Sequence, residues 1–428
     1  MSSTRNKVFV AMSGGVDSSV AALLLKEQGY DCTGVFMKCW SGDGPDALVG
    51  VQCAWERDAE DARRAANHLG IPFYTFDFEK EYKKKVVEYM LAGYKKGITP
   101  NPDVMCNREI KFGLFLKKAL SLGADFVATG HYVRIETRDK RQETSRNTPV
   151  TRHSLLFAAR DASKDQSYFL WTLTQKELAH CLFPIGDYLK SEVREMARKA
   201  GLPTADKKDS QGICFLGDVD VFDFLKKHIK EKRGDILTTD GKKVGEHRGV
   251  WFYTIGQRHG LDIKESGKLL RREGAHETTP FYVAGKDVKK NILVVAEGSE
   301  DPALFQREAT LTDVSFITGE YSNVRTNIRV SSRRDGMRSG FPVLARVRYR
   351  QPLVRASLAQ LKTLDSKQKT RTRDSLFLSM VYSLQFEVPV KFVAPGQSAV
   401  FYRASGNPSL RSGSKFDDFE LLGGGVIV

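Results

Sequence analysis

The chain has 428 residues, of which 41% are hydrophobic and 28% charged, a composition that predicts two or three folded domains and excludes a disordered protein. It lacks the uninterrupted apolar stretch of ~20 residues that a membrane-spanning helix needs, so we expect an intracellular protein without membrane association. Lys and Arg number 67 against 52 Asp and Glu, and the net charge of +15 favours a polyanionic partner such as nucleic acid.

Strand-like runs alternate with amphipathic helical stretches in the first half of the chain. Strands are expected at Lys7–Met12, Cys32–Met37, Phe73–Phe76 and Asp125–Thr129. Helices are expected at Ser18–Gln28, Trp55–Leu69, Glu79–Ala92 and Glu109–Leu122. This alternation predicts a parallel sheet covered by helices on both faces, in which ligands bind at the carboxyl ends of the strands.

Three further patterns follow before the texture of the chain changes. Residues 138–152 are polar and show no apolar periodicity, which predicts a flexible surface insertion. Helical periodicity returns at Gln166–Leu173 and at Ser191–Ala200, where Gly201 and Pro203 provide a C-terminal stop.

The second half of the chain is rich in short β-like runs. After Gly234 they are Asp235–Thr238, Trp251–Ile255, Phe281–Ala284 and Ile292–Val295. From about Arg307 they are Val343–Tyr349, Leu353–Ser357, Val390–Val393 and Ala399–Tyr402, which predict a small β-barrel. Lys362–Arg373, with five basic residues and one acidic, is predicted to be a disordered loop. We therefore expect three domains, at 1–215, 216–304 and 305–428.

The segment Ser13–Ser19, which reads SGGVDSS, follows a strand and opens a helix. Its glycines allow close approach of a phosphate, and the helix N-terminus presents unpaired N–H groups to an anion. The serine hydroxyls add donors, and Asp17 is expected to orient the loop or to help hold Mg²⁺. The lysine of the G-x-x-x-x-G-K-[ST] loop is absent, and the segment instead resembles the PP-loop of enzymes that use ATP to adenylate a substrate and release pyrophosphate.

Two cysteines lie in distinctive settings. Cys106 follows Pro100 and Pro102, which predict a loop up to the cysteine and a helix after it. A thiol at a helix N-terminus near Arg108 is expected to have its pKa lowered toward thiolate, and Asp103 is a candidate acid or base.

The setting of Cys214 leaves two interpretations open. It lies in the glycine-bracketed segment Asp209–Gly217, where a buried strand cysteine is an equal alternative to a reactive one. No C-x-x-C pair occurs, and His131 has no second histidine at ligand spacing, so no metal site is predicted.

These motifs together resemble the tRNA-specific 2-thiouridylase family. They occur in the same order over nearly the whole chain: Ser13–Ser19, Asn101–Phe112, Gly130–Tyr132, Asp165–Leu170, Asp209–Gly217, Tyr253–Arg258, Ala394–Tyr402 and Leu422–Gly425. The insertion at 138–152 and the extended region 358–389 depart from the family pattern, and both are expected to be surface loops.

The resemblance implies an N-terminal α/β parallel-sheet domain of the adenine nucleotide alpha-hydrolase-like, PP-loop type, a small β-rich central tRNA-binding domain and a C-terminal β-barrel. It further implies that ATP, with Mg²⁺, adenylates the C2 oxygen of the wobble uridine and that persulfide sulfur then replaces this oxygen. The implied ATP contacts are Ser13, Gly14, Gly15, Val16, Asp17, Ser18, Ser19, Met37 and Gly130.

The resemblance also assigns roles to the two cysteines. Cys214 would carry the persulfide, Cys106 would be its partner thiol and form a disulfide with it, and Asp103 would be the acid–base group. The implied substrate contacts are Asn101, Gln166, Arg350 and Gln351. The implied partners are tRNA and a persulfide-sulfur donor protein, and a monomer is expected. The high pI of about 9.4 and the polar insertions favour a mitochondrial member of the family, with the bacterial cytoplasm as the alternative.

Several alternatives stay open from the residues alone. The nine arginines of the stretch 325–355 suit a tRNA backbone, and a solvated barrel face explains them equally well. A PP-loop ligase or amidotransferase acting on a small molecule would need neither cysteine. A non-catalytic RNA-binding protein would bind tRNA without forming AMP. An iron–sulfur thiolase is disfavoured because Glu109, and not a cysteine, lies three residues after Cys106.

Overall fold

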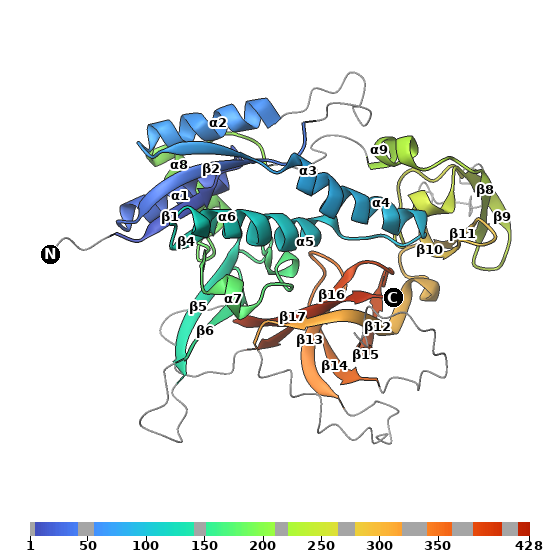
Figure 1. Cartoon of the computed structure of the whole chain (residues 1–428). Coiled ribbons are helices and arrows are strands. Elements are labelled where there is room, and N and C mark those ends of the chain that lie inside the picture. The colour runs from blue at the N-terminus through green and yellow to red at the C-terminus, as the bar shows by residue number, and fades with distance from the viewer. Residues whose placement is uncertain are drawn as a thin grey trace, which may run out of the picture.

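The computed structural model describes residues 5–41, 55–140, 151–209, 221–263, 279–318, 340–361, 380–404 and 418–428. Their strands form three sheets: one in the order β3-β2-β1-β4-β7, one in the order β10-β11-β8-β9, and one that closes on itself. The first sheet and its helices lie above the closed sheet, and the second sheet lies beside them (Figure 1).

The first sheet is parallel at every junction. Its strands are β1 (Lys7–Ala11), β2 (Asp31–Lys38), β3 (Phe73–Asp77), β4 (Phe126–Thr129) and β7 (Cys181–Leu182). The four strands predicted in this region are confirmed, with ends that differ by at most one residue. The predicted α/β parallel-sheet class is therefore confirmed.

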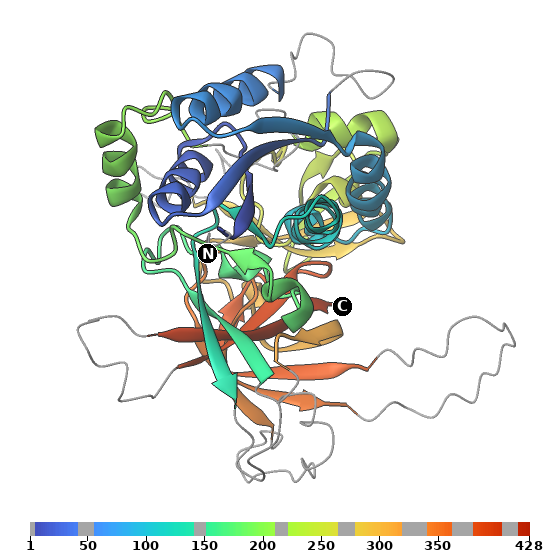
Figure 2. The same cartoon turned by 60° about the vertical axis from the view of Figure 1, so that its left-hand side comes forward.

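Helices cover both faces of this sheet (Figure 2). One face carries α1 (Val16–Glu27), α2 (Trp55–His68) and α8 (Lys190–Lys199). The other face carries two long helices with π-helical centres: α3 (Glu79–Tyr82), η1 (Lys83–Val87) and α4 (Glu88–Lys95), then α5 (Pro102–Cys106), η2 (Asn107–Phe115) and α6 (Leu116–Ser121).

Strand β1 explains this arrangement because its side chains alternate between two cores. Val8 and Val10 are fully buried beneath α1 and α2, whereas Ala11 packs against the helices of the opposite face. Alternating side chains of a strand point to opposite faces of its sheet, so a strand that is apolar on both faces has to be covered twice.

The central region begins with α9 (Val221–His228) and forms a four-stranded sheet. Its strands are β8 (Gly234–Thr238), β9 (Lys243–His247), β10 (Phe281–Asp287) and β11 (Ile292–Glu297). The strand predicted at Trp251–Ile255 is wrong, because a 3₁₀ turn at Val250–Phe252 stands there. Backbone groups of this segment bond to side chains, where those of a strand would bond to a neighbouring strand. The Asn291 side-chain oxygen accepts from the Val250 N–H, and the Lys286 ammonium donates to the Tyr253 carbonyl oxygen.

The C-terminal region is the predicted β-barrel. Six strands, in the order β12-β15-β14-β13-β16-β17, close through pairing of β12 with β17. They are β12 (Phe305–Phe316), β13 (Phe341–Arg346), β14 (Val354–Gln360), β15 (Tyr382–Lys391), β16 (Ser398–Ala404) and β17 (Phe419–Ile427). Fully buried side chains such as Leu311, Leu384 and Phe401 fill its core.

A hairpin that follows β4 in the chain joins the parallel sheet to the barrel. Strands β5 (Val133–Lys140) and β6 (Thr151–Ala158) pair with each other, and β6 pairs with β17. The prediction of a flexible insertion over 138–152 is therefore wrong at both ends, and residues 141–150 lie outside the described residues. A strand at a sheet edge tolerates polar side chains, which explains the lack of apolar periodicity.

The region 358–389 is likewise not a single surface loop. Its first residues belong to β14 and its last to β15, while Lys362–Arg373 lies outside the described residues. The β-like runs predicted at Leu353–Ser357 and Val390–Val393 overlap only part of β14 and β15, because polar residues interrupt the two-residue period in the rest of each strand.

The helix predicted at Gln166–Leu173 is also wrong, because only a 3₁₀ turn, η3 (Ser167–Phe169), forms there. The barrel holds this segment in place: the Tyr168 hydroxyl donates to the Ser398 carbonyl (2.8 Å), and the Trp171 indole N–H donates to the Ser398 hydroxyl (3.1 Å). The helix predicted at Ser191–Ala200 is confirmed as α8. No helix in the described ranges has both the length and the apolar character for a membrane crossing.

Candidate active site

The loop Ser13–Ser19 joins β1 to α1 at the carboxyl edge of the parallel sheet. Gly15 is the N-cap of α1, and its carbonyl oxygen accepts hydrogen bonds from the hydroxyls of Ser18 (3.1 Å) and Ser19 (3.0 Å). Both serines are buried, so these two hydroxyls shape the loop. The first N–H groups of α1 have no acceptor within the helix, as at any helix start, and such groups are suited to an anion.

Two glycines are required by close packing. Gly14 has φ +77°, and a Cβ there would lie 2.2 Å from the Asp58 carbonyl oxygen in α2. Gly130 directly follows β4, and its Cβ would lie 2.7 Å from the backbone nitrogen of Ser18. In β2, Val35 is paired in register with Ala11, the last residue of β1. Met37 lies two residues further along β2, near its end. Met37 and Gly130 therefore flank the loop from the two strands beside β1.

Asp17, in the first turn of α1, is held by two residues far away in the sequence. The Lys190 ammonium lies 2.7 and 2.8 Å from the two carboxylate oxygens of Asp17, and the Tyr132 hydroxyl donates to the first of them (2.9 Å). Burial, helped by the charge of Asp17, raises the pKa of Tyr132, so the phenol remains a hydrogen-bond donor at neutral pH.

Lys190 also contacts Asp209, at 2.8 Å. Burial alone would raise the pKa of Asp209, but hydrogen bonds from Lys164 and Lys190 outweigh it and lower the pKa to about 2. Arg194 adds a third cation to this carboxylate, at 2.7 Å. Sequence reasoning missed Lys190, since a single lysine at a helix start carries no motif.

The helix that carries Cys106 begins earlier than predicted. Asn101 is the N-cap of α5, its side-chain oxygen accepts from the Val104 N–H (3.2 Å), and Pro102 occupies the first helical position. Proline is well suited there, because the N–H it lacks would have no helical partner. The expectation of a thiol at a helix N-terminus is therefore wrong: Cys106 is the fifth residue of α5 and is buried. Asp103 lies in the first turn and is partly exposed.

The Cys106 helix contacts the other candidate segments. The side-chain amide of Asn107 donates to the Phe169 carbonyl (3.2 Å), and the Phe112 ring lies 5.8 Å from the His131 ring. His131 is buried, and its Nδ1 lies 2.7 Å from the Thr129 hydroxyl. Burial lowers the pKa of His131, so the imidazole is neutral at physiological pH.

Gln166 is fixed against Tyr132, which contacts the loop Ser13–Ser19 through Asp17. Its side-chain oxygen accepts from the Tyr132 N–H (2.9 Å), and its backbone N–H donates to the Tyr132 carbonyl (2.9 Å). Because the Tyr132 hydroxyl contacts Asp17, a continuous path runs from the loop through Tyr132 to Gln166. The structure thus brings together the loop, Gly130, Gln166 and the Cys106 helix.

The barrel closes this region from below. Arg346, which is 8% exposed, forms a buried ion pair with Asp165 and hydrogen bonds with the Tyr402 hydroxyl. Arg348 donates to the carbonyl oxygens of Phe392 and Ile255. Neither a tRNA-facing nor a solvated side chain, the two alternatives left open by the sequence, describes these two arginines, because both side chains hold parts of the protein together.

The predicted substrate contacts of the barrel lie in the turn between β13 and β14. Arg350 is exposed with φ +65°, and its guanidinium lies 5.1 Å from the Tyr349 ring centroid. The Tyr349 ring in turn lies 4.6 Å from the ring of Phe169, close in sequence to Gln166. The Gln351 amide donates to the Lys391 carbonyl (3.0 Å). The arginines at 325, 329, 333, 334 and 338 lie outside the described residues.

Cys214 lies outside the described residues, so its pairing with Cys106 stays a prediction. Across the described ranges, no group of three His, Cys, Asp or Glu side chains is arranged to hold a metal ion.

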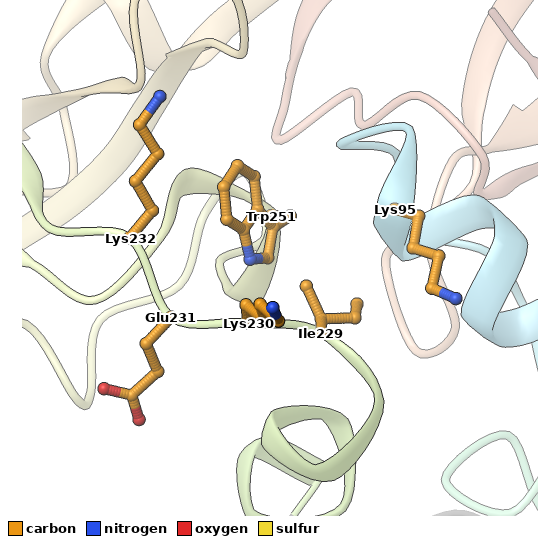
Figure 3. A pocket seen from close by; sticks show the side chains of 6 residues that line it. All are labelled: Lys95, Ile229, Lys230, Glu231, Lys232 and Trp251. Atoms are coloured by element: carbon orange, nitrogen blue, oxygen red, sulfur yellow. The ribbon is translucent and has the colours of Figure 1, made fainter.

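A pocket of about 450 Å³ lies between the end of α4 and the segment that follows α9 (Figure 3). Lys95 from α4 borders one side, and Trp251 with the segment Ile229–Lys232 borders the other. Three of the lining side chains are lysines against one glutamate, so the pocket is basic.

Comparison with known proteins places this geometry in a family. The model of the tRNA methyl transferase HUP domain matches residues 6–218, and that of the tRNA methyl transferase PRC-barrel domain matches residues 222–297. A Bacillus licheniformis protein named tRNA-specific 2-thiouridylase MnmA is 42% identical over 98% of this chain and 94% of its own length. The chain belongs to the tRNA-specific 2-thiouridylase family. Relatives of the same name from Geobacillus thermodenitrificans (98% of this chain, 94% of the relative) and Staphylococcus aureus strain Newman (94% of each) are also 42% identical.

These 2-thiouridylase relatives are bacterial proteins, which favours the bacterial alternative over the mitochondrial location predicted from the sequence. Among solved structures, an NMN synthetase from Francisella tularensis aligns with a TM-score of 0.30 and 18% identity over 49% of this chain and 67% of that one.

Proposed function

We propose that this protein replaces the C2 oxygen of the wobble uridine in tRNA with sulfur, in a reaction driven by ATP. The observation that carries the proposal is the near full-length similarity to proteins named tRNA-specific 2-thiouridylase. The geometry supports it, because the loop Ser13–Ser19 and the Cys106 helix are linked through Tyr132, Gln166 and Asn107 at one edge of the sheet.

In the first step, the uridine O2 attacks the α-phosphate of ATP, the bond to pyrophosphate breaks, and the uridine carries AMP on its former carbonyl oxygen. The protein prepares this step with the close-packed glycines and the N–H groups at the start of α1, which suit a phosphate chain. Asp17 is the carboxylate of the loop and would hold Mg²⁺, which supplies charge neutralisation to the phosphates when bound.

In the second step, the terminal sulfur of a Cys214 persulfide attacks C2, and AMP leaves with the electron pair of the C2–O bond. The Cys106 thiolate then attacks the inner sulfur of Cys214, which releases the 2-thiouridine and leaves a Cys106–Cys214 disulfide. A dithiol reductant has to reopen that disulfide, and a persulfide donor protein has to reload Cys214. Asp103 serves as the acid–base group at the start of the helix.

Two amide side chains would hold the uracil. The side-chain oxygen of Asn101 caps α5, and that of Gln166 accepts from the Tyr132 N–H. In each residue the side-chain NH₂ group would therefore be the one that donates to the base. The base has to leave its stack to reach them, at a cost of a few kcal/mol. The net charge of +15 and the lysines of the pocket beside Trp251 support attraction of the tRNA backbone.

The test incubates the protein with ATP, Mg²⁺, a persulfide donor, a dithiol and unmodified tRNA, and measures 2-thiouridine and AMP. Cys106→Ser and Cys214→Ser are expected to abolish thiolation. Cys32→Ser is the matched control, because Cys32 is a buried thiol near the start of β2, at the opposite edge of the sheet from the loop. AMP formation without 2-thiouridine, unchanged in both serine variants, would instead favour a small-molecule ligase.

The names of the two family models suggest methyl transfer as a second possible reaction. The same assay distinguishes methyl transfer from thiolation. S-adenosylmethionine replaces ATP and the persulfide donor in a parallel reaction, and the nucleosides are compared by mass. A methylated uridine would overturn the proposal, whereas a uridine with sulfur in place of oxygen supports it.

A further inference from the structure

Lys190, at the start of α8, contacts Asp17 of the loop Ser13–Ser19, although it lies 173 residues after Asp17 in the sequence. Its ammonium contacts both carboxylate oxygens of Asp17 and one of Asp209, and the side chain is only 12% exposed. It also lies 5.8 Å from the ring centroid of Tyr132, which packs beside the loop. A mostly buried lysine is thus held at the first turn of α1.

The loop itself offers no cation. The sequence SGGVDSS contains one charged side chain, that of Asp17, and the next lysine along α1 is Lys26 in the last turn. In loops that contain a lysine, this side chain reaches the terminal phosphates of the nucleotide. A tetra-anionic nucleotide that approaches a loop with an unneutralised carboxylate would be repelled.

We propose that Lys190 supplies this missing cation: it contacts the triphosphate and stabilises the pyrophosphate as it leaves. The inference rests on the proposed function. When the uridine O2 forms its bond to the α-phosphorus, the bond to the bridging oxygen breaks and the electron pair stays on pyrophosphate. Lys190 donates hydrogen bonds to that growing charge.

The surrounding contacts favour this role over simple neutralisation of Asp209. Asp209 has two further cations, Lys164 at 2.7 Å and Arg194 at 2.7 Å. Among the described residues, Lys190 is the cation in ion-pair contact with Asp17. If Asp17 binds Mg²⁺ when the nucleotide arrives, the N–H groups of Lys190 that now contact Asp17 can donate to the phosphates instead.

The backbone at Lys190 is anchored independently of its side chain. Its N–H donates to the Asp161 carboxylate (3.0 Å), and the preceding N–H, that of Leu189, donates to Glu192 (2.7 Å). A substitution of the side chain should therefore leave the start of α8 in place, which makes Lys190 suitable for mutation.

The experiment measures Mg²⁺–ATP affinity and tRNA-dependent AMP formation for the full-length wild type, Lys190→Met and Lys190→Arg. Lys190→Met is expected to lower kcat/KM for ATP by about hundredfold, the effect of losing one charged donor to a transition state, and to weaken ATP binding. The affinity for tRNA is expected to stay within about twofold, because the lysine is held within the protein. Lys190→Arg should recover part of the loss, since it keeps the charge.

The matched control is Arg194→Met, which removes a cation from Asp209 and leaves Asp17 paired. It is expected to retain ATP affinity. Equal losses in Lys190→Met and Arg194→Met would show that both act through Asp209 and would overturn the inference, as would a Lys190→Met variant that binds and turns over ATP like the wild type. A wild type that forms no 2-thiouridine contradicts the proposed function instead, and ATP affinity still decides the role of Lys190.

Discussion

The side-chain amide of Gln397, in the barrel, donates a 2.8 Å hydrogen bond to the carbonyl oxygen of Thr99, 298 residues earlier in the chain. The same nitrogen lies 3.3 Å from the Pro100 carbonyl oxygen. Helix α5, which ends at Cys106, starts two residues later. The barrel therefore fixes the backbone from which the candidate catalytic groups of α5 extend.

Gln397→Ala is expected to slow thiolation by about tenfold while leaving the KM for ATP unchanged, because a small displacement of reacting groups is costly and the ATP loop is not touched. Steady-state kinetics of 2-thiouridine formation check this. Gln175→Ala is the matched control, since the Gln175 amide also donates to two carbonyl oxygens, those of Ser154 and Ile317, away from α5. Both variants should lose ~1–3 kcal/mol of stability, so equal effects on kcat would contradict a positioning role of Gln397.

The buried ion pair of Arg346 with Asp165 links the barrel to the Gln166 segment. Arg346→Met is expected to lower the free energy of unfolding by ~3–5 kcal/mol, because it leaves the buried carboxylate without its cation. Urea denaturation followed by fluorescence measures this. Arg355→Met, at an exposed barrel arginine, should change the same free energy by no more than ~0.5 kcal/mol.

The buried Lys286 is expected to make the free energy of unfolding depend on pH. Burial lowers its pKa from 10.5 to about 8, so between these pH values the unfolded chain holds a proton that the folded chain has released. Stability contributed by this site therefore rises as the pH increases from about 8 to 10.5. Thermal unfolding of the wild type and Lys286→Met across this range should show a rise that only the wild type has. Parallel curves for the two proteins would refute the assignment to Lys286.

Gly130→Ala should weaken ATP binding by about tenfold or more, because its Cβ would lie 2.7 Å from the Ser18 nitrogen and 2.8 Å from the Asp17 carbonyl carbon, so the loop has to shift. Calorimetric titration with Mg²⁺–ATP measures the affinity. Gly285→Ala is the control, as the nearest atom to its Cβ would be an ordinary contact of 3.6 Å with Val294. Full ATP affinity in Gly130→Ala would show that the loop does not depend on this packing.

The lysines beside Trp251 should contribute to tRNA binding through phosphate contacts. Lys230→Ala and Lys232→Ala are each expected to reduce the slope of log Kd against log salt by about 1, if each neutralises one phosphate. Filter binding at several salt concentrations measures the slope. Lys199→Ala, at an exposed lysine paired with Glu195 in α8, should leave it unchanged. An unaltered slope in all three variants would remove this pocket from the tRNA surface.

Much of the catalytic fold could be predicted because its signals are local. Strands β1 and β4 are short runs of mostly apolar residues, and the loop Ser13–Ser19 contains the glycines and serines of its own strand-to-helix turn. The start of α5 differs from the prediction although its cap is local, because proline disfavours the interior of a helix but fits the first helical position, which Pro102 occupies.

Local residues specify the loop Ser13–Ser19 and the strands of the parallel sheet, since these depend on neighbours in the chain. The pairing of Lys190 with Asp17 and the burial of Arg346 against Asp165 arise only when distant elements pack together. A lysine or arginine has the same local preferences in solvent and in an ion pair, so its partner is set by which distant elements pack together. The pairing of β6 with β17 could not be predicted for the same reason, because the partner of a strand depends on the whole fold and not on the strand's own residues.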